Sequence, residues 1–261
     1  MIAAARDPET VVVTGAATGI GRATAVAFGR LGAWVLVVDR NAERARETLA
    51  LVRETGGEGR FAEVDVTGLT ALRAALDDAV AERGRIDVLV NNAGTPMAVR
   101  IEDITEAQYE HVLAVNLTAT FFACKHVIEH MLVTGAGAIV NTASDMGLVA
   151  GLPNQPAYVA SKGAVVMLTK ALAIDYAEHG IRVNCVCPCL TDTPMIDDFL
   201  ATQFPDEAER TRVKAELHAV QPIARMNTPE EVASAILWLG TPASSGTTGV
   251  ALPVDGGFVA R

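Results

Sequence analysis

The chain is predicted to form a single α/β domain built around a parallel β-sheet. Strand-like apolar runs alternate with helical segments throughout its 261 residues, which is the pattern of βαβ units. Several runs are continuous stretches of β-branched residues, as in strands buried on both faces. Hydrophobic residues make up 50% of the chain, and this length and composition suit one domain with a large core.

Seven strands are expected, with helices between them. The first strand leads into a glycine-rich turn and a helix over Gly19–Leu31. The second leads into a helix over Asn41–Glu54, whose Arg and Glu residues mark an exposed face. The predicted strands, in chain order, are Thr10–Val13, Ala33–Val38, Arg60–Val66, Ile86–Asn91, Ala138–Ala143, Ile181–Cys187 and Gly249–Val254.

Residues with capping chemistry mark several helix ends. The side chains of Thr67, Thr105 and Thr228 precede helical patterns and can accept hydrogen bonds from first-turn N–H groups. Gly56 and Gly84 follow helical patterns, where glycine tolerates the left-handed conformation that ends a helix. These five residues are predicted helix boundaries.

One stretch departs from the alternation, between about residues 190 and 227. It contains Pro194, Pro205 and Pro222 with broken helical patterns between the last two strands. Long segments of this kind in compact domains often form lids or binding loops. We expect one domain over residues 1–261 with a substrate-covering insertion at about 190–227; an ordinary long connection is the alternative.

Charge and hydropathy argue against several partners. The net charge of −10 comes from interspersed acids and bases, without the basic run that neutralises nucleic-acid phosphates. The N-terminal Met1–Arg6 lacks the long apolar core of a signal peptide, and no later run is predicted to reach membrane-spanning length. A soluble cytoplasmic protein with neither a nucleic-acid nor a membrane partner is expected.

The four cysteines do not suggest a disulfide framework. Cys185, Cys187 and Cys189 alternate in a predicted strand, so their side chains share one face, whereas Cys124 belongs to a distant helical stretch. Three aligned thiols suggest a thiolate metal site, but no companion Cys or His cluster has ligand spacing. We predict small buried residues and no metal site.

A glycine-rich turn follows the first strand. Its residues, Thr14–Gly21, carry glycines spaced as GxxxGxG and open the first helix. Small residues let the backbone approach a pyrophosphate, and the helix N-terminus offers it N–H groups and a positive dipole end. The pattern alone is weak, but its place between a strand and a helix predicts a dinucleotide site.

Asp39 ends the second strand, about twenty residues further on, where a carboxylate can accept hydrogen bonds from ribose hydroxyls. It would repel the extra phosphate of NADP, so NAD is the expected cofactor. Arg40 is the counter-argument, because an adjacent guanidinium can bind a phosphate. Asp65–Val66 and Asn91–Gly94 close the third and fourth strands, at the edge where ligands of open α/β sheets bind.

Tyr158 and Lys162 are spaced so that they share one face of a helix. A free phenol has a pKa near 10, which must fall by about three units for proton transfer around pH 7. A neighbouring ammonium acts in that direction. The pair is predicted to donate and accept a proton, and the alternative is a solvated helix face. Neither Tyr109 nor Tyr176 has Lys at the same offset.

Several motifs occur in a fixed order along the chain. They are TGxxxGxG at Thr14–Gly21, NNAG at Asn91–Gly94, the set Asn116, Ser144, Tyr158 and Lys162, then Asn184–Met195 and finally Val254–Gly257. In this order the chain resembles the short-chain dehydrogenase/reductase family, in its compact single-domain form, over essentially its full length. The resemblance implies a doubly wound (Rossmann), mostly parallel seven-stranded sheet with helices on both faces, NAD(H) or NADP(H), and a homotetramer or homodimer.

The resemblance also assigns catalytic roles. Tyr158 would be the general acid/base, and Lys162 would lower its pKa and hold the nicotinamide ribose. Ser144 would hydrogen-bond the substrate oxygen, and Asn116 would order a water beside Lys162. Thr193 would contact the nicotinamide carboxamide. The expected cofactor-binding residues are Gly15, Thr18, Gly19, Ile20, Gly21, Asp39, Arg40, Asp65, Val66, Asn92, Ala93, Gly94, Tyr158, Lys162, Pro188, Thr191 and Thr193.

Two residues depart from the family pattern. Cys189 follows Pro188 where the family usually has glycine, so its side chain would reshape the site. It would also be strained there if the glycine conformation had a positive φ. Thr191 stands where an aliphatic residue is more usual. The sequence leaves two interpretations of the Cys189 thiol: it is sensitive to oxidants, or it is packed and inert.

The expected function is that of an NAD(H)-dependent oxidoreductase that interconverts a secondary alcohol and a ketone by hydride transfer, with Tyr158 handling the proton. A 3-oxoacyl thioester reductase is an alternative if Arg100, Arg210 or Arg212 lies near the site. A non-catalytic dinucleotide-sensing protein is another. A methyltransferase that uses S-adenosylmethionine would leave Tyr158 and Lys162 without a role.

A small neutral substrate is expected, either cyclic, sugar-like or steroid-like, because the candidate wall is mixed apolar and polar. Further wall candidates are Met97, Leu152 and Phe199. The predicted substrate-binding residues are Ser144, Asp145, Met146, Asn154, Gln155, Tyr158 and Met195.

Overall fold

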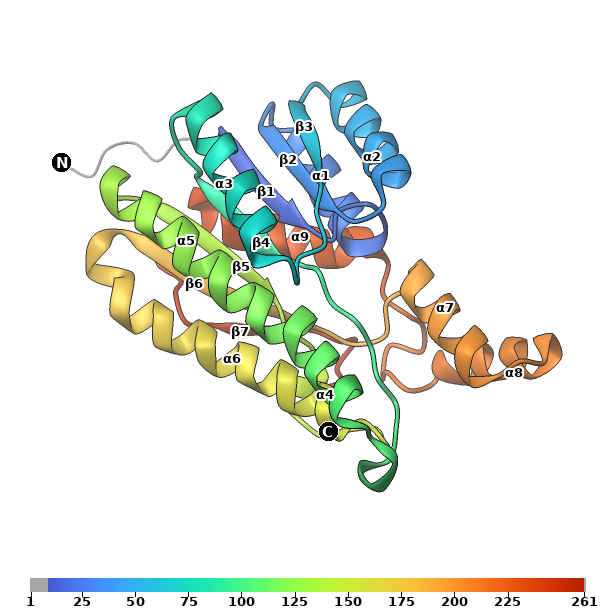
Figure 1. Cartoon of the computed structure of the whole chain (residues 1–261). Coiled ribbons are helices and arrows are strands. Elements are labelled where there is room, and N and C mark those ends of the chain that lie inside the picture. The colour runs from blue at the N-terminus through green and yellow to red at the C-terminus, as the bar shows by residue number, and fades with distance from the viewer. Residues whose placement is uncertain (1–8, 261) are drawn as a thin grey trace.

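A seven-stranded sheet forms the centre of the computed structural model, which describes residues 9–260 (Figure 1). The strands are β1 Thr10–Thr14, β2 Trp34–Asp39, β3 Glu58–Glu63, β4 Val88–Asn91, β5 Gly137–Thr142, β6 Ile181–Pro188 and β7 Ala251–Val254. Every pairing is parallel, in the order β3-β2-β1-β4-β5-β6-β7. The predicted parallel α/β sheet is confirmed. The N-terminal Met1–Arg6 lies outside the described residues.

Helices cover both faces of the sheet, so the fold is doubly wound. α1, α2 and α9 pack on one face, and α3 to α6 on the other (Figure 1). α7 and α8 extend from the body as an arm. The helices are α1 Gly19–Gly29, α2 Ala42–Glu54, α3 Leu69–Arg83, α4 Glu106–Leu113, α5 Ala119–Thr134, α6 Pro156–Tyr176, α7 Pro194–Gln203, α8 Glu207–Leu217 and α9 Pro229–Gly240.

The core lies between the sheet and its two helical layers. Successive side chains of a strand point to opposite faces, and β1 shows this directly. Val12 packs in the cluster under α3 and α5, whereas Val11 and Val13 pack in the cluster under α1 and α9. All three valines are fully buried. The continuous β-branched runs therefore belong to strands that are covered on both sides, as the sequence predicts.

Some predicted boundaries differ from the structure. The third strand was expected at Arg60–Val66 but runs from Glu58 to Glu63, because it pairs in register with all of β2. Val64 and Val66 are buried beyond its end, so burial there does not indicate a strand. The predicted N-cap Thr67 is wrong by one residue: Gly68 precedes α3, and Thr67 instead hydrogen-bonds Asp65.

Other predicted boundaries are confirmed. Thr105 and Thr228 each form a capping box at the start of α4 and α9. Gly84 ends α3 in the left-handed conformation, with φ 78°. Gly56 also has a positive φ and follows α2 after Thr55. The sequence therefore predicts these ends well where one side chain or one backbone conformation determines them.

Two helical stretches are long and apolar enough to cross a membrane, by length and composition only, contrary to the expectation that no run reaches spanning length. They are Glu106–Thr134, in which a π-helical turn at residues 114–118 joins α4 to α5, and Pro156–His179, which contains α6. In each, a large share of the most apolar window is buried inside the domain. Helices that pack against a sheet commonly have this composition.

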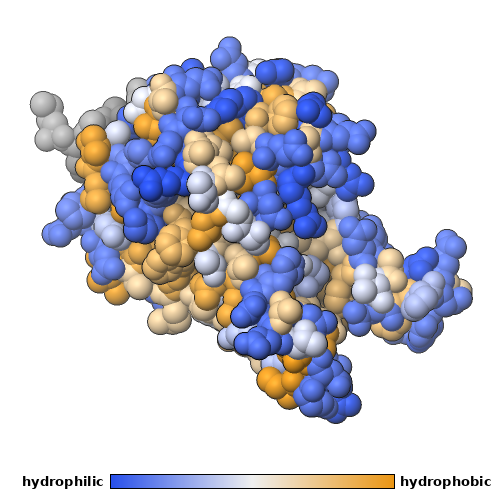
Figure 2. Space-filling model, in the orientation of Figure 1, coloured by the Kyte–Doolittle hydropathy of each residue, from blue (hydrophilic) through white to orange (hydrophobic). Residues whose placement is uncertain are grey.

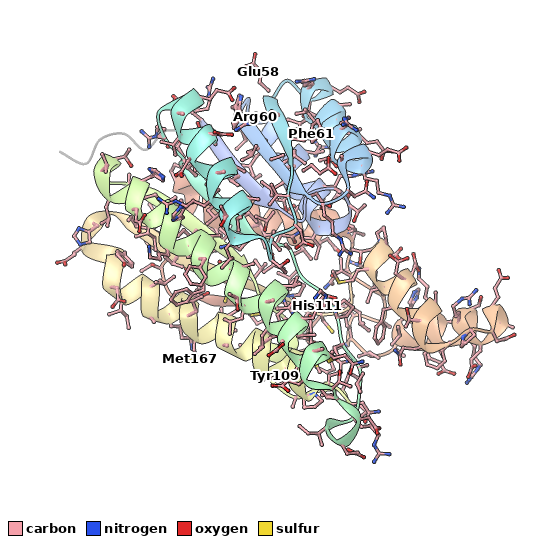
Figure 3. All side chains as sticks on the ribbon, in the orientation of Figure 1. Glu58, Arg60, Phe61, Tyr109, His111 and Met167 are labelled. Carbon is pink, nitrogen blue, oxygen red and sulfur yellow. The ribbon has the colours of Figure 1, made fainter. Side chains whose placement is uncertain are left out.

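The outer faces of α5 and α6 carry exposed apolar side chains. Phe121 and Phe122 on α5 are almost half exposed, and Met167 and Ile174 on α6 are 61% and 81% exposed. Met167 points away from the sheet in Figure 3, and apolar residues gather over these helices in Figure 2. This surface is called the α5–α6 face below.

Candidate active site

A cleft of about 880 Å³ lies at the carboxyl edge of the sheet, where ligands of doubly wound folds bind. The segments that follow β1, β2, β4, β5 and β6 line it, together with α6, α7 and two residues of α8, Val213 and Leu217. The arm of α7 and α8 comes from the stretch that the sequence marks as an insertion. The predicted site residues that line the cleft are Gly15, Thr18, Gly19, Ile20, Asp39, Arg40, Asn92, Ala93, Gly94, Ser144, Asp145, Met146, Gln155, Tyr158, Lys162, Pro188, Thr191, Thr193 and Met195.

The glycine-rich turn after β1 fits a dinucleotide because its backbone is closely surrounded. Gly15 has φ +63°, and a Cβ there would lie 2.7 Å from the Cα of Ala93. A Cβ on Gly21 would lie 2.1 Å from the carbonyl oxygen of Gly15. Gly21 does not line the cleft and instead allows α1 to approach the turn. Side chains are thus excluded where backbone N–H groups at the start of α1 face a ligand.

Thr14 and Asn92 join the turn after β1 to the segment after β4. The backbone N–H groups of Asn92 and Ala93 donate to the Thr14 Oγ1, at 3.0 and 3.1 Å. The Asn92 Nδ2 donates to the carbonyl oxygens of Thr14 and Gly15, at 3.2 and 3.0 Å. The NNAG motif is therefore partly structural, since it holds the two sides of the switch point together.

The carboxylate of Asp39 is fixed at the end of β2. Its Oδ2 accepts from the Ala17 N–H at 3.0 Å, and its Oδ1 accepts from the Asn41 N–H at 2.9 Å. Both contacts leave lone pairs for hydroxyl donors. Arg40 and Arg44 line the same end of the cleft. The sequence reasoning missed Arg44, which lies in the first turn of α2.

The predicted catalytic residues meet in the middle of the cleft. Tyr158 and Lys162 extend from α6, and Ser144 follows β5. The Ser144 hydroxyl lies beside Tyr158 and acts to lower the pKa of its phenol. The Lys162 Nζ donates to the carbonyl oxygen of Thr142 at 2.8 Å and lies 5.9 Å from the centre of the Tyr158 ring. Ser144 and Lys162 are 5% and 4% exposed, so protein encloses both, whereas Tyr158 is only partly buried and faces the cleft.

Burial controls the ionisation of this cluster in the chain alone. It raises the pKa of Tyr158 to about 12, and the neighbouring Asp145 and Cys189 add to the increase. It also lowers the pKa of Lys162 to about 8. The predicted lowering of the Tyr158 pKa by Lys162 is not seen, because the ammonium group is directed at the Thr142 carbonyl. Its charge alone does not overcome the burial of the phenol.

Asn116 lies in the π-helical turn and links three segments. Its Oδ1 accepts from the Thr95 N–H at 2.8 Å, and its Nδ2 donates to the Thr95 carbonyl and to the Ser161 Oγ. Both amide hydrogens are therefore used within the protein, while Oδ1 keeps one lone pair. A Cβ on Gly94 would lie 3.4 Å from the Asn116 Oδ1 and 3.5 Å from the Lys162 Nζ. Both groups therefore lie next to Gly94, on its Cβ side.

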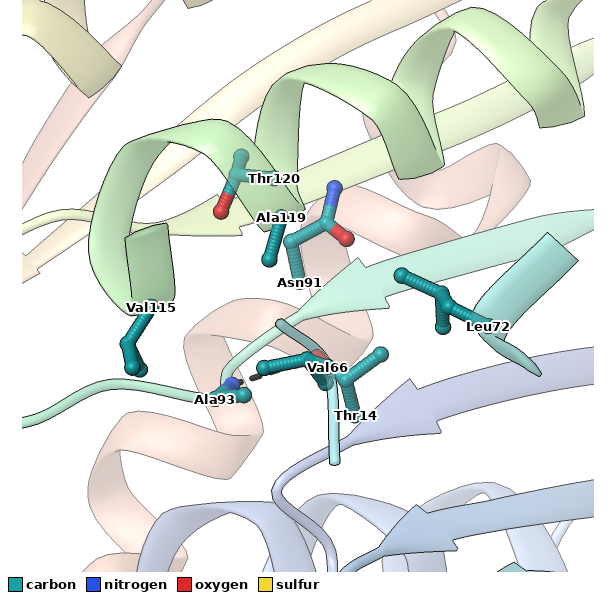
Figure 4. Close-up of a pocket in the computed structure, with 8 residues that line it drawn as sticks. All are labelled: Thr14, Val66, Leu72, Asn91, Ala93, Val115, Ala119 and Thr120. Atoms are coloured by element: carbon teal, nitrogen blue, oxygen red, sulfur yellow. Dashed lines mark hydrogen bonds between the residues drawn. The ribbon is translucent and has the colours of Figure 1, made fainter. Parts of the chain in front are cut away.

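Besides Gly21 and Asn116, three further predicted site residues do not line the cleft. Asn154 is exposed in a left-handed conformation, with φ 61°, which directs this polar residue into a turn. Asp65 is exposed and accepts from Thr67. Val66 lines a narrow gap at the start of α5, with Thr14 and Ala93 (Figure 4). That gap has no room for a water-sized molecule.

Cys189 and Thr191 are accommodated without strain. Among the described residues, Asn154 is the single non-glycine residue with a positive φ, so Cys189 does not adopt a glycine conformation. Burial, followed by the hydrogen bond to Asp145, raises the pKa of the Cys189 thiol. Thr191 is buried, and its Oγ1 donates to the Cys189 carbonyl oxygen at 3.1 Å. Within residues 9–260, no group of three or more His, Cys, Asp or Glu side chains has metal-binding geometry.

Known proteins match this chain over nearly its whole length. The family model described as enoyl-(acyl carrier protein) reductase matches residues 15–259. Cis-4-hydroxycyclohexanecarboxylate dehydrogenase of Sinomonas cyclohexanicum is 41% identical over 254 residues, covering 97% of each chain. 3β-Hydroxysteroid dehydrogenase of Mediterraneibacter gnavus is 38% identical over 264 residues, covering 97% of this chain and 95% of the relative.

A solved structure shares the fold closely. It is that of carveol dehydrogenase from Mycobacterium avium in complex with NAD, with a TM-score of 0.91, 30% identity, and coverage of 97% of this chain and 98% of that one. The doubly wound sheet and its glycine-lined cleft define the class of dinucleotide-binding oxidoreductases. The chain belongs to the short-chain dehydrogenase/reductase family. It is an oxidoreductase of CH–OH groups that uses a nicotinamide dinucleotide.

Proposed function

We propose that the protein is an NAD(H)-dependent dehydrogenase that interconverts a secondary alcohol and a ketone. One observation supports this most strongly: Tyr158, Ser144 and Lys162 meet in one cleft whose other end holds Asp39. A redox cofactor that extends from Asp39 along the glycine-rich turn would reach the tyrosine. A bound nicotinamide ring supplies the hydride chemistry, which no side chain of this chain can provide.

In this proposal Tyr158 takes the hydroxyl proton of the alcohol during oxidation and returns it during reduction. Ser144, which lies beside Tyr158, holds the substrate oxygen next to the phenol. Lys162 carries a positive charge below its pKa of about 8, which favours ionised Tyr158 over neutral Tyr158. Asn116 holds α6 and the segment after β4 together through Ser161 and Thr95, and its free lone pair would accept from a water beside Lys162.

Asp39 supports NAD over NADP. Two backbone N–H groups fix its carboxylate at the end of β2, so it cannot swing away from a ribose hydroxyl. A phosphate at that position would meet this negative charge at close range. Arg40 and Arg44 line the same end, and we propose that they contact the adenine or the pyrophosphate rather than a ribose phosphate.

The substrate end favours a neutral, largely apolar molecule. Apolar side chains from three separated segments face the cleft there. They are Met97, Val99, Leu152, Met195, Phe199, Phe204, Val213 and Leu217. This composition suits a cyclic or steroid-like alcohol, and the two relatives are named for a hydroxylated ring acid and a hydroxysteroid.

A 3-oxoacyl thioester reductase is the second candidate, favoured by the description of the matching family model. The cations that would suit a phosphate-bearing carrier do not line the cleft. Arg100 pairs with Glu102, and Arg212 pairs with Glu209 and Glu216. Arg210 donates to backbone carbonyls. A non-catalytic dinucleotide sensor would need no Tyr158–Ser144 pair.

A turnover screen tests the proposed function. The purified protein is incubated with NAD⁺ or NADP⁺ and a panel of cyclic, sugar-like and steroid alcohols, and with the reduced cofactors and matching ketones or 3-oxoacyl thioesters. We expect NAD⁺-linked oxidation of at least one cyclic secondary alcohol. Binding of NADH without any turnover would favour the sensor, and faster reduction of thioesters than of ketones would favour the second candidate.

The remaining proposals concern partners and location. We propose a cytoplasmic enzyme that acts on small molecules and has neither a nucleic-acid nor a membrane partner. We also propose that it assembles as a homotetramer or homodimer through the α5–α6 face. Exposed apolar residues on two adjacent helices support this assembly, because self-association removes such surface from water.

A further inference from the structure

A hydrogen-bond network joins the glycine-rich turn to α2 at the cofactor end of the cleft. Its central side chain is Arg22, in the first turn of α1. The Arg22 Nε donates to the Ala17 carbonyl oxygen at 2.9 Å and to the Thr48 Oγ1 at 3.0 Å. Its Nη2 donates to the Arg44 carbonyl oxygen at 3.3 Å and to the Glu47 Oε2 at 2.9 Å. One guanidinium group therefore connects the turn after β1 with the first half of α2.

Thr48 supports this connection from inside the domain, where its side chain is fully buried. Its Oγ1 lies 3.2 Å from the Ala17 carbonyl oxygen and 3.1 Å from the Arg44 carbonyl oxygen. A hydroxyl group has one proton and two lone pairs, so Thr48 donates to one of these carbonyls and accepts from Arg22. Thr48 thus holds the guanidinium group where it reaches both elements.

The hydrogen bonds form a closed circuit that includes Asp39. The Ala17 N–H donates to the Asp39 Oδ2, and the Asn41 N–H donates to the Asp39 Oδ1. The Asn41 Oδ1 accepts from the Arg44 N–H at 3.0 Å, and the Arg44 carbonyl accepts from Arg22. Both residues whose N–H groups hold the carboxylate are therefore connected to Arg22. Ala17 is connected directly, and Asn41 is connected through Arg44.

Arg22 acts through this circuit and not by touching a ligand. Arg22, Glu47 and Thr48 do not line the cleft, whereas Asp39 and Arg44 do. The Arg22 side chain is 29% exposed and forms an ion pair with Glu47, so a carboxylate already balances its charge. These contacts give Arg22 the role of a brace for Asp39.

We propose that Arg22, supported by Thr48, is a positioning residue that fixes the Asp39 carboxylate and so sets the preference for NAD(H) over NADP(H). The inference rests on the proposed function, in which Asp39 accepts from a ribose hydroxyl of the cofactor. Without Arg22, the turn after β1 and the start of α2 can move apart, and the carboxylate loses its fixed direction. A ribose hydroxyl then loses an oriented acceptor, while a ribose phosphate meets weaker repulsion.

Arg22→Met removes the guanidinium donors and keeps much of the apolar stem. We expect the dissociation constant of NADH, measured by fluorescence titration, to rise about fivefold or more. The constant of NADPH should rise less or fall, so the preference between the two cofactors becomes smaller. Arg30→Met is the matched control, because Arg30 is exposed at the C-terminal end of α1. It loses the same charge and should bind both cofactors as the wild type does.

A double-mutant cycle with Asp39→Ala distinguishes positioning from a general loss of structure. If Arg22 acts through Asp39, Arg22→Met should weaken NADH binding by less than about twofold once residue 39 is alanine. A loosened fold would weaken binding by the same factor in both backgrounds. Equal factors in the two backgrounds would therefore overturn the proposal.

Thr48→Val is a second variant that keeps the shape of a buried side chain. It removes the hydroxyl that holds Arg22, so it should raise the dissociation constant of NADH about threefold and reduce the same preference. Circular dichroism checks that each variant is folded, and Thr48→Val carries the test if Arg22→Met does not fold.

The titrations need no turnover, so they separate this inference from the proposed function. Wild-type NADH affinity in both Arg22→Met and Thr48→Val, together with weaker binding by Asp39→Ala, would overturn the role of Arg22 alone. Wild-type NADH affinity in Asp39→Ala would remove the proposed cofactor contact and the role of Arg22 with it. If no alcohol is oxidised but the variants bind NADH as expected, the proposed function fails and the role of Arg22 stands.

Discussion

Tyr158 is subject to opposing electrostatic effects at the scale of a single residue. Burial holds the proton on the phenol and raises its pKa to about 12. A proton acceptor that works near neutral pH therefore needs positive charge beside it in the complex. Lys162 is mostly protonated at pH 7, since its pKa is about 8. We expect oxidation to depend on a bound cationic nicotinamide in addition to Lys162.

Asp39 carries the prediction about the cofactor. Asp39→Ala removes an oriented, charged acceptor for ribose hydroxyls, so it should raise the KM for NAD⁺ about tenfold or more and change that for NADP⁺ far less. Initial rates with both cofactors measure this, and Asp175→Ala is the control for loss of an exposed charge. Equal effects on the two cofactors would rule out the proposed contact.

The sequence predicts individual site residues best where one motif brings them together. Tyr158 and Lys162 share a helix face, and Asp39 ends a strand, so local spacing is enough to place them. The contact between Asp145 and Cys189 joins the segments after β5 and β6. The two residues come together because these strands pair in parallel, and no local sequence pattern predicts their contact.

At the scale of elements, the start of α9 offers a direct test of capping. The Thr228 Oγ1 accepts from the Glu231 N–H at 3.3 Å, and the Glu231 Oε2 accepts from the Thr228 N–H at 2.8 Å. Thr228→Ala should lower the free energy of unfolding by about 1 kcal/mol. Urea denaturation measures the change. Thr211→Ala, at an exposed position inside α8, should have little effect, and an equal loss there would contradict the assignment.

Element boundaries were predictable where a cap or a glycine determines them, as at Thr105 and Gly84. They were less predictable where tertiary pairing decides. β3 starts at Glu58 because each residue of β3 has a partner in β2. Val66 lies beyond the end of β3, but its apolar side chain led the sequence analysis to include it in the strand. The stretch at about 190–227 was expected as a substrate-covering insertion, but its helices α7 and α8 were not predicted, because they lack a strong apolar pattern.

At the scale of the whole molecule, the sheet order brings the carboxyl ends of β1, β4, β5 and β6 together and so assembles the site. The alternation of strands and helices predicts this arrangement, because parallel strands need crossover helices. The alternation does not show how the α5–α6 face is covered. Its exposed Val133, Met167 and Ile174 are the basis for the proposed assembly.

Met167→Asp tests that assembly. A charge placed in the middle of a buried interface is costly, so the variant should shift the molar mass in light scattering toward that of a single chain. Leu31→Asp, a similar change at an exposed residue beyond α1 on the opposite face of the sheet, should keep the wild-type mass. A wild-type mass for Met167→Asp, or a single chain in the wild type, would contradict assembly through this face.

The central claim, that Tyr158 transfers the proton in an NAD-linked oxidation, is tested most directly by Tyr158→Phe. The substitution removes one hydroxyl group from the cleft and keeps the ring. We predict that kcat for the best alcohol falls by at least about a hundredfold at every pH, while the affinity for NADH, measured by fluorescence titration, stays within about twofold of wild type. Turnover close to that of the wild type would contradict the account.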